Sequence, residues 1–163
     1  MFEILHDRPK KRLVAAYAND AHTIAGVEMA RKQGLVEGTL VGDREAIAKS
    51  CRDENIDPDS FLIVHEPDEM NAARKAVALI NKGEGDLLMK GLVSTDKYMR
   101  AILDKENGLM NPGAILTHVS VLEIPGYHKL LTVGDVAIIP QPELKEKIAI
   151  LNVLIKTAHS LWI

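Results

Sequence analysis

A lysine and two hydroxyl side chains lie close together in the segment Met-Lys-Gly-Leu-Val-Ser-Thr, residues 89–95. Lys90 ends a short apolar run, and Ser94 and Thr95 open a segment with helical spacing. An ammonium group, hydroxyl donors and the unpaired amides of a helix start can together bind an anion, and a phosphate fits this description. Gly91 would let the backbone approach that anion closely. On spacing alone, the alternative that the hydroxyl cluster only caps the helix is favoured.

A second group of polar residues lies in the apolar segment Leu-Thr-His-Val-Ser-Val, residues 116–121. On a strand, His118 and Ser120 would face one side of the sheet and Thr117 the other. The imidazole of His118 could carry a proton or donate a hydrogen bond to a carbonyl oxygen. The alternative is a hydrogen-bonded histidine at a strand end.

Asp135 stands between apolar residues in Val-Gly-Asp-Val, residues 133–136. A carboxylate inside a strand is costly unless it has a partner, so Asp135 is a stronger site candidate than the acids of the surface. The alternative is a capping or bulge aspartate that follows Gly134.

Several function classes find no support in the chain. The six histidines form no H-x-x-x-H or H-E-x-x-H pair, so we predict no metal site. No G-x-G-x-x-G segment is present for a dinucleotide. The net charge of −3 and the aromatic content of 4% do not fit a nucleic-acid binder. With one cysteine, no signal peptide and no apolar stretch of membrane length, we expect a cytoplasmic protein that contacts no membrane.

The elements that must position these residues alternate regularly over the first two thirds of the chain. Continuous apolar strands followed by helices predict a mostly parallel sheet with helices on both faces, a three-layer α/β/α fold. In such a sheet, ligands bind beyond the carboxyl ends of the strands, where Lys90 and Gly91 are expected. The predicted strands are residues 12–18, 38–42, 61–65 and 86–90, and the predicted helices are residues 21–33, 43–55, 67–82 and 95–104.

The pattern changes after residue 105. A loop with Asn-Gly and Asn-Pro-Gly signals leads to two predicted strands, residues 114–124 and 129–139, joined by a tight turn as a hairpin. A final helix follows with one strongly apolar face. We therefore predict a first α/β domain over residues 1–112, and the opening hairpin and helix of a second, incomplete domain over residues 113–163. The residues of the apolar face are Leu144, Ile148, Leu151, Ile155 and Ala158.

Five blocks in order resemble the phosphate acetyltransferase/phosphate butyryltransferase family, and the chain looks most like the butyryl branch. The resemblance implies transfer of a short acyl group from acyl-CoA to phosphate, with coenzyme A as co-substrate and no redox cofactor. It also implies a fold similar to that of isocitrate and isopropylmalate dehydrogenases, and a homodimer. The blocks are GTLVGDREAI, ARKAVALINKGEGDLLMKGLVST, AILDKENGL, ILTHVSVLEIPGYHKLL and GDVAIIPQPELKEK.

The same resemblance implies roles for the candidate residues. Lys90, Gly91, Ser94 and Thr95 match the phosphate-side loop of the family, and Arg100 matches an arginine that follows it. From these matches we expect the side chains of this loop and Arg100 to hold phosphate or the CoA phosphates.

The matching residues of the next segments would line the cleft, where we expect Thr117 to bind phosphate or CoA. Thr117, His118 and Ser120 match a strand that lines the cleft in the family, so we expect His118 and Ser120 to border the reacting carbonyl. Asp135 matches an aspartate of the next strand, and we expect it to orient a partner.

The resemblance covers nearly the whole chain, but family members are nearly twice as long. A Ser-Arg-x-x-Ser segment that carries much of the family's proposed catalysis is missing from this sequence. We therefore expect a C-terminally truncated member. The alternative to an enzyme is a non-catalytic module that folds and binds CoA or phosphate weakly.

Overall fold

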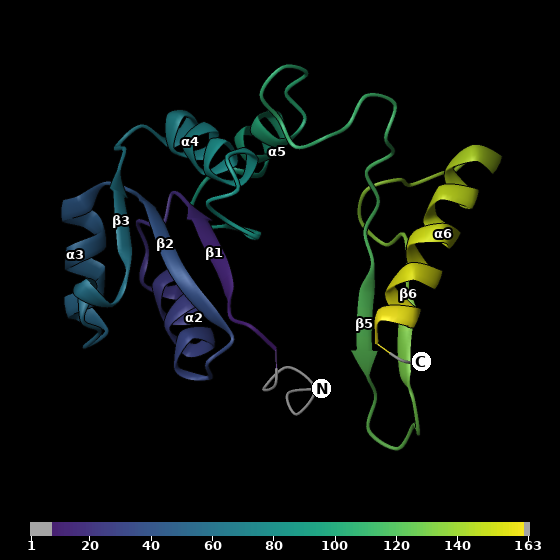
Figure 1. The fold of residues 1–163 in the computed structure, drawn as a ribbon, viewed down its shortest axis with the longest axis horizontal. Helices are drawn as coiled ribbons and strands as arrows, with labels where there is room; N and C mark the ends of the chain where they lie inside the picture. The colour runs from purple at the N-terminus through teal and green to yellow at the C-terminus, as the bar shows by residue number, and fades with distance from the viewer. Residues whose placement is uncertain (1–7, 162–163) are drawn as a thin grey trace. The chain divides into compact units, whose positions relative to one another are not determined.

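The chain divides into two compact units between Met110 and Asn111. The computed structural model describes residues 8–161 (Figure 1). The domain boundary predicted from the sequence lies two residues farther along, between residues 112 and 113. Each unit forms its own strands and helical segments.

Unit 1 is built on a four-stranded parallel sheet with the strand order β3-β2-β1-β4. Each predicted apolar run forms a strand and each segment with helical spacing forms a helix, so the expected alternation is confirmed. The elements of unit 1 are β1 (Lys11–Ala16), α2 (Ala21–Lys32), β2 (Val36–Gly42), α3 (Arg44–Asp53), the 3-10 turn η1 (Pro58–Ser60), β3 (Leu62–His65), α4 (Glu69–Asn81), β4 (Leu87–Lys90) and α5 (Thr95–Ile102).

Helices cover both faces of this sheet, which confirms the three-layer arrangement. On one face, Leu40 of β2 is fully buried against Ile24 of α2 and Ile47 of α3. On the other face, Val14 of β1 packs with Val77 of α4, and α5 contributes to the same cluster. The central strands β1 and β2 are continuously apolar because residues on both of their faces are buried, whereas the edge strands β3 and β4 are only partly covered.

Helix caps fix where the helices of unit 1 begin, just beyond the carboxyl ends of the strands. Asp20, Asp43, Asp68 and Ser94 occupy the cap positions, and a side-chain oxygen of each accepts an amide two or three residues later. Each cap satisfies a backbone donor that has no partner inside its helix. The caps therefore hold four helix starts at the edge where ligands of parallel sheets bind.

Unit 2 contains a hairpin of two short antiparallel strands, β5 (Ser120–Glu123) and β6 (Leu130–Val133). The hairpin was predicted, but the predicted strands were too long. Thr117 and His118 precede β5, and Asp135 follows β6 rather than lying inside a strand. The physical reason is that the Asp135 carboxylate accepts the backbone amides of His118, Ala137 and Ile138. These amides are therefore not available to the hydrogen bonds between the strands.

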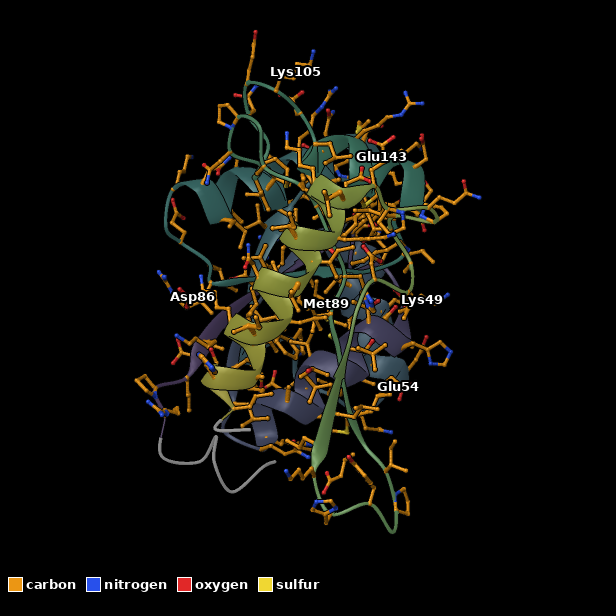
Figure 2. All side chains as sticks on the ribbon, turned by 90° about the vertical axis from the view of Figure 1, so that its right-hand side faces the viewer. Lys49, Glu54, Asp86, Met89, Lys105 and Glu143 are labelled. Carbon is orange, nitrogen blue, oxygen red and sulfur yellow. The ribbon has the colours of Figure 1, made fainter. Side chains whose placement is uncertain are left out.

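The final helix, α6 (Leu144–Ser160), begins with a capping box formed by Glu143, labelled in Figure 2, and Glu146. Its predicted apolar face does not pack on the hairpin. Leu144 and Leu151 are 74% and 55% exposed, and Ile148 and Ile155 are also exposed. Instead Ile150, on another side of the helix, is 6% exposed and is the one almost fully buried apolar side chain among residues 111–161.

Within residues 8–161, no helix combines the length and the apolar character that crossing a membrane requires.

Candidate active site

The predicted phosphate-side residues lie at the carboxyl edge of the sheet in unit 1. Lys90 is the last residue of β4, Gly91 follows it, and Thr95 is the first residue of α5. The side chains of Lys90, Ser94 and Thr95 are exposed. The placement expected from the strand pattern is therefore present, while the roles of these residues remain predictions.

Gly91 is needed for packing against the end of β1. A Cβ atom at this position would lie 2.7 Å from the carbonyl oxygens of both Ala16 and Tyr17. The Gly91 amide donates to Ala16 O (3.0 Å), and the Leu92 amide donates to Tyr17 O (2.9 Å). The glycine thus allows the chain that leaves β4 to lie directly against β1, and buried Val93 anchors the loop in the core.

Ser94 caps α5, as the alternative interpretation of the hydroxyl cluster predicts. Its Oγ accepts the amide of Lys97 at 3.4 Å. Its own amide donates to Oε1 of Glu69, the first residue of α4, at 2.6 Å. The amide and the hydroxyl of Ser94 therefore both have partners within unit 1.

The basic side chains around this loop differ in whether a carboxylate neutralises them. Lys97 pairs with Glu69, and Arg100 pairs with Asp96 at 3.0 Å. Lys90 has no carboxylate partner within residues 8–161, and its Nζ lies 3.5 Å from the carbonyl oxygen of Gly91. Lys90 is therefore the ammonium group that this loop leaves available for an external anion.

Glu69 was not among the candidates found in the sequence. Hydrogen bonds from the Lys97 side chain and the Ser94 amide hold the pKa of Glu69 below its ordinary value. The hydrogen bond to Glu69 raises the pKa of Lys97 in turn. A glutamate after the cap residue Asp68 looks like an ordinary first-turn acid, so no local sequence signal identifies these contacts.

In unit 2, Asp135 ties the approach to β5 to the turn after β6. Its Oδ2 accepts the Thr117 hydroxyl at 2.9 Å and the His118 amide at 3.2 Å. Its Oδ1 accepts the amides of Ala137 and Ile138, both at 2.9 Å. The same carboxylate thus binds four donors from two segments of the chain.

These contacts decide what Asp135 can do chemically. Desolvation raises the pKa of Asp135, but the hydrogen bonds from Ala137, Ile138, Thr117 and His118 outweigh it and leave the pKa below its usual range. A carboxyl group with a depressed pKa is a poor proton acceptor at neutral pH. Asp135 binds Thr117 and the backbone amide of His118, and the expectation that it orients a partner in catalysis stays a prediction.

His118 and Ser120 lie close to the start of β5. The Nδ1 atom of His118 is buried and has no hydrogen-bond partner within the part of the chain that the structure describes. Ser120 is the first residue of β5 and lies opposite Val133. Thr117 and His118 precede β5, so the two-faced pattern expected of a strand does not apply to them.

The structure therefore brings the candidates together in two groups, one in each unit. The first group, in unit 1, is Lys90, Gly91, Ser94, Thr95 and Arg100, and the second, in unit 2, is Thr117, His118, Ser120 and Asp135. Among residues 8–161, no three His, Cys, Asp or Glu side chains are placed to hold a metal ion.

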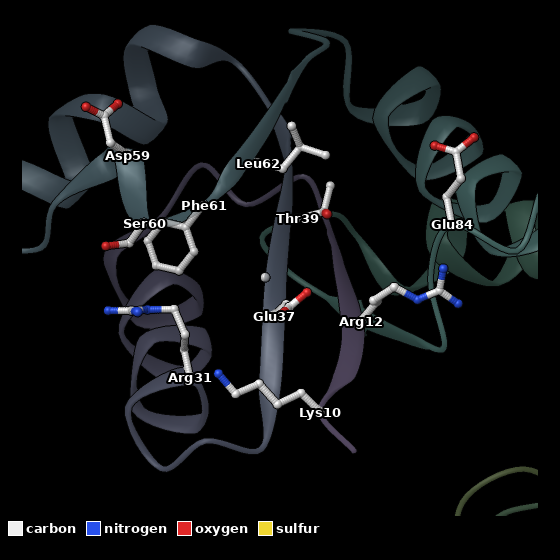
Figure 3. A pocket seen from close by; sticks show the side chains of 11 residues that line it. Lys10, Arg12, Arg31, Glu37, Thr39, Asp59, Ser60, Phe61, Leu62 and Glu84 are labelled. Atoms are coloured by element: carbon white, nitrogen blue, oxygen red, sulfur yellow. The ribbon is translucent and has the colours of Figure 1, made fainter.

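A cavity of about 650 Å³ lies at the opposite, amino edge of the sheet in unit 1 (Figure 3). Its walls include Lys10, Glu37 and Phe61, and basic and acidic side chains are mixed around it. Two of its arginines are already paired, Arg12 with Asp86 and Arg31 with Glu28. None of the candidate residues lies in this cavity.

Comparison with known proteins connects these observations. Residues 63–163 match the family described as phosphate acetyl/butaryl transferase. The chain belongs to this family. The matched segment contains both groups of candidate residues, from β3 through the hairpin to α6.

Relatives of this family align along nearly the whole chain. Phosphate butyryltransferase of Clostridium acetobutylicum is 40% identical over 153 residues, which cover 94% of this chain and 50% of that protein. Phosphate acetyltransferase of Thermotoga maritima is 33% identical, covering 91% of this chain and 50% of that protein. The chain thus spans about half the length of the relatives it matches.

Solved structures support the fold. A branched-chain phosphotransacylase from Enterococcus faecalis superposes with a TM-score of 0.77 at 22% identity, over 94% of this chain and 52% of the other. A phosphotransacetylase from Staphylococcus aureus superposes with a TM-score of 0.70 at 15% identity, over 91% and 53%. The α/β fold with a mostly parallel sheet is therefore the fold of these enzymes.

Proposed function

We propose that this protein transfers a short acyl group, butyryl or a similar one, from acyl-CoA to inorganic phosphate. The observation that carries the proposal is the 40% identity to a phosphate butyryltransferase across 94% of the chain, through both groups of candidate residues. The Lys90 ammonium lies at the carboxyl edge of a parallel sheet and has no carboxylate partner among residues 8–161, which supports an anionic substrate at this position.

The proposed reaction needs no redox cofactor, because no electrons are exchanged with a third compound. An oxygen of hydrogen phosphate attacks the thioester carbonyl carbon, and a C–O bond forms while the C–S bond breaks. The proton of the phosphate goes to the departing thiolate, so the products are acyl phosphate and CoA. Side chains accelerate such a step by stabilising the charge that develops on the carbonyl oxygen and the sulfur.

In this proposal the residues of unit 1 bind phosphate groups of the substrates. The Lys90 ammonium provides the charge and the Thr95 hydroxyl an additional donor. Gly91 and Ser94 hold the loop through the backbone contacts described above. Arg100 joins by exchanging Asp96, with which it forms an exposed pair, for a phosphate.

The residues of unit 2 act at the reacting carbonyl. His118 and Ser120 border the thioester, with the imidazole or the hydroxyl as hydrogen-bond donor to the carbonyl oxygen. Asp135, ionised and holding four donors, keeps Thr117 and the His118 backbone in place. We further propose that the protein is a cytoplasmic homodimer with acyl-CoA and phosphate as its small-molecule partners.

Thiol release from acyl-CoA tests the substrate class. The unchanged chain is mixed with butyryl-CoA or acetyl-CoA, and free CoA is measured with and without phosphate. We expect phosphate-dependent release that is faster with butyryl-CoA by about 10-fold or more, since each methylene in an apolar pocket contributes about 1–3 kcal/mol. Equal rates with both thioesters would contradict the butyryl preference, and release that ignores phosphate would contradict the acyltransferase.

A second candidate function is a module that binds CoA or phosphate without catalysis. It is favoured by the observation that the residues expected to bind phosphate or CoA, with the exception of Thr117, all lie in unit 1, which has its own core. A folded chain that binds CoA but releases no thiol would support this candidate over the enzyme.

A further inference from the structure

The carboxylate of Glu69 lies where two helix starts meet at the carboxyl edge of the sheet in unit 1. Glu69 is the first residue of α4, and Ser94 is the cap residue of α5. One carboxylate oxygen accepts the Ser94 amide at 2.6 Å, and the other pairs with the ammonium of Lys97. These contacts join residues 25 and 28 positions apart, so only the fold creates them.

In this arrangement Lys97 and Lys90 differ in whether a carboxylate neutralises their charge. The charge of Lys97 is neutralised by Glu69, and the amide of Ser94 is occupied. Lys90, at the end of β4, has no carboxylate partner within residues 8–161. An anion that approaches from solution therefore meets an unpaired ammonium at Lys90 and a paired one at Lys97.

We infer that Glu69 is a positioning residue that masks Lys97 and the Ser94 amide, so that Lys90 is the point at which unit 1 meets a phosphate group. The inference rests on the proposed function only for the identity of the anion. The Glu69 side chain is 25% exposed, so its two contacts are partly shielded from water and can persist when phosphate is added.

A masking role and a purely structural role of Glu69 predict opposite changes in phosphate binding when Glu69 is removed. If Glu69 only stiffened the loop, its loss would loosen the Lys90 end and weaken phosphate binding. If Glu69 masks Lys97, its loss frees an ammonium and a backbone amide at a helix start, and these groups together attract an anion. Removing the negative charge should therefore strengthen phosphate binding.

The test is a titration of the ¹⁵N-labelled chain with inorganic phosphate, followed by the amide signals of Gly91 and Ser94. In the unchanged chain we expect the Gly91 signal to move and the Ser94 signal to stay. In Glu69→Gln the Ser94 signal should move as well, and phosphate should bind about 3- to 10-fold more tightly, as charge-assisted hydrogen bonds allow. In the double variant Glu69→Gln with Lys97→Met, this gain should disappear.

Glu66→Gln is the matched control, because it removes one negative charge from a neighbouring pair, Glu66 with Lys75 at 3.0 Å, and leaves Ser94 untouched. An equal gain in both single variants, or weaker binding in Glu69→Gln, would overturn the inference. If phosphate moves the Ser94 signal in the unchanged chain, the inference is overturned. This outcome needs no variant, so it applies even if Glu69→Gln fails to fold. A Gly91 signal that ignores phosphate would instead contradict the proposed phosphate position at Lys90.

Discussion

At the scale of single residues, two carboxylates organise the candidate groups, and they differ in how visible they are in the sequence. Asp135 could be identified because a carboxylate between apolar residues needs a partner. Glu69 could not, because its partners lie 25 and 28 positions away and its own surroundings look like an ordinary helix start. Side-chain contacts across such distances depend on the fold, and no local pattern encodes them.

The variant Asp135→Asn should loosen the approach to β5. An asparagine side chain has one oxygen in place of two and cannot accept four donors, so Thr117 or the backbone amides lose partners. We expect faster hydrogen exchange at His118 and Ala137. Asp104→Asn is the control, since Asp104 accepts two amides of a turn in unit 1. Unchanged exchange in unit 2 would show that Asp135 does not hold this segment.

Asp86 should make the stability of unit 1 depend on pH in the acidic range. A hydrogen bond from the Arg12 side chain, with a second from its backbone amide, holds the pKa of Asp86 below its usual range in the folded chain. Its contribution is therefore present above about pH 4, the unfolded value, and is lost as the pH falls toward the folded value.

Thermal unfolding of the unchanged chain and of Asp86→Asn checks this effect. The difference between their melting temperatures should be largest near pH 7 and should shrink progressively below about pH 4. A difference that is constant from about pH 7 to about pH 2.5 would mean that the Arg12–Asp86 contact does not stabilise the fold through charge.

At the scale of elements, the sequence predicted the order and type of almost every segment, because the signals are local. Cap residues such as Asp43 and Asp68 and continuous apolar runs define helices and strands within a few positions. The ends of β5 and β6 were predicted wrongly because Asp135 accepts backbone amides that the predicted strands, residues 114–124 and 129–139, would have used in the ladder. For α6, periodicity identified an apolar face, but the structure packs the helix through Ile150.

The loop between β4 and α5 should tolerate no side chain at Gly91. In Gly91→Ala, the added methyl group meets two backbone carbonyl oxygens that cannot rotate away. We expect the free energy of unfolding to fall by about 1–3 kcal/mol, the usual cost of overpacking. Urea unfolding followed by circular dichroism measures it.

Gly26→Ala provides the comparison for this variant. Gly26 lies inside α2, and a Cβ atom there meets only the end of Met89 at 3.7 Å, an ordinary contact. The free energy of unfolding should rise by up to about 1 kcal/mol, because alanine favours helix more than glycine does. Equal effects of the two variants would show that the contacts of Gly91 with β1 do not matter.

At the scale of the whole molecule, the two units differ in how much apolar surface they bury. Unit 1 has two clusters of buried apolar side chains, one on each face of its sheet. Within residues 111–161, Ile150 alone is almost fully buried, and Leu144, Ile148, Leu151 and Ile155 are exposed on α6. Since burial of apolar surface drives folding, the stability of the chain should reside mainly in unit 1.

Hydrogen exchange of the unchanged chain tests this difference. We expect the amides of β1 and β2 to exchange more slowly than those of β5, β6 and α6 by at least about 10-fold, because unit 2 opens at a lower free energy. Equal protection of α6 and β1 would contradict the prediction and would indicate that the exposed face of α6 is covered in solution.

Formation of butyryl phosphate is the most direct test of the proposed acyl transfer. The unchanged chain and Lys90→Met are incubated with butyryl-CoA and phosphate, and butyryl phosphate is trapped with hydroxylamine while free CoA is measured. We predict equal amounts of butyryl phosphate and CoA from the unchanged chain, and a rate lower by about 10-fold or more in Lys90→Met, since a hydrogen bond to a charged group contributes about 1.5–3 kcal/mol. A folded chain that forms no butyryl phosphate, or that releases CoA without it, would contradict the proposed acyl transfer.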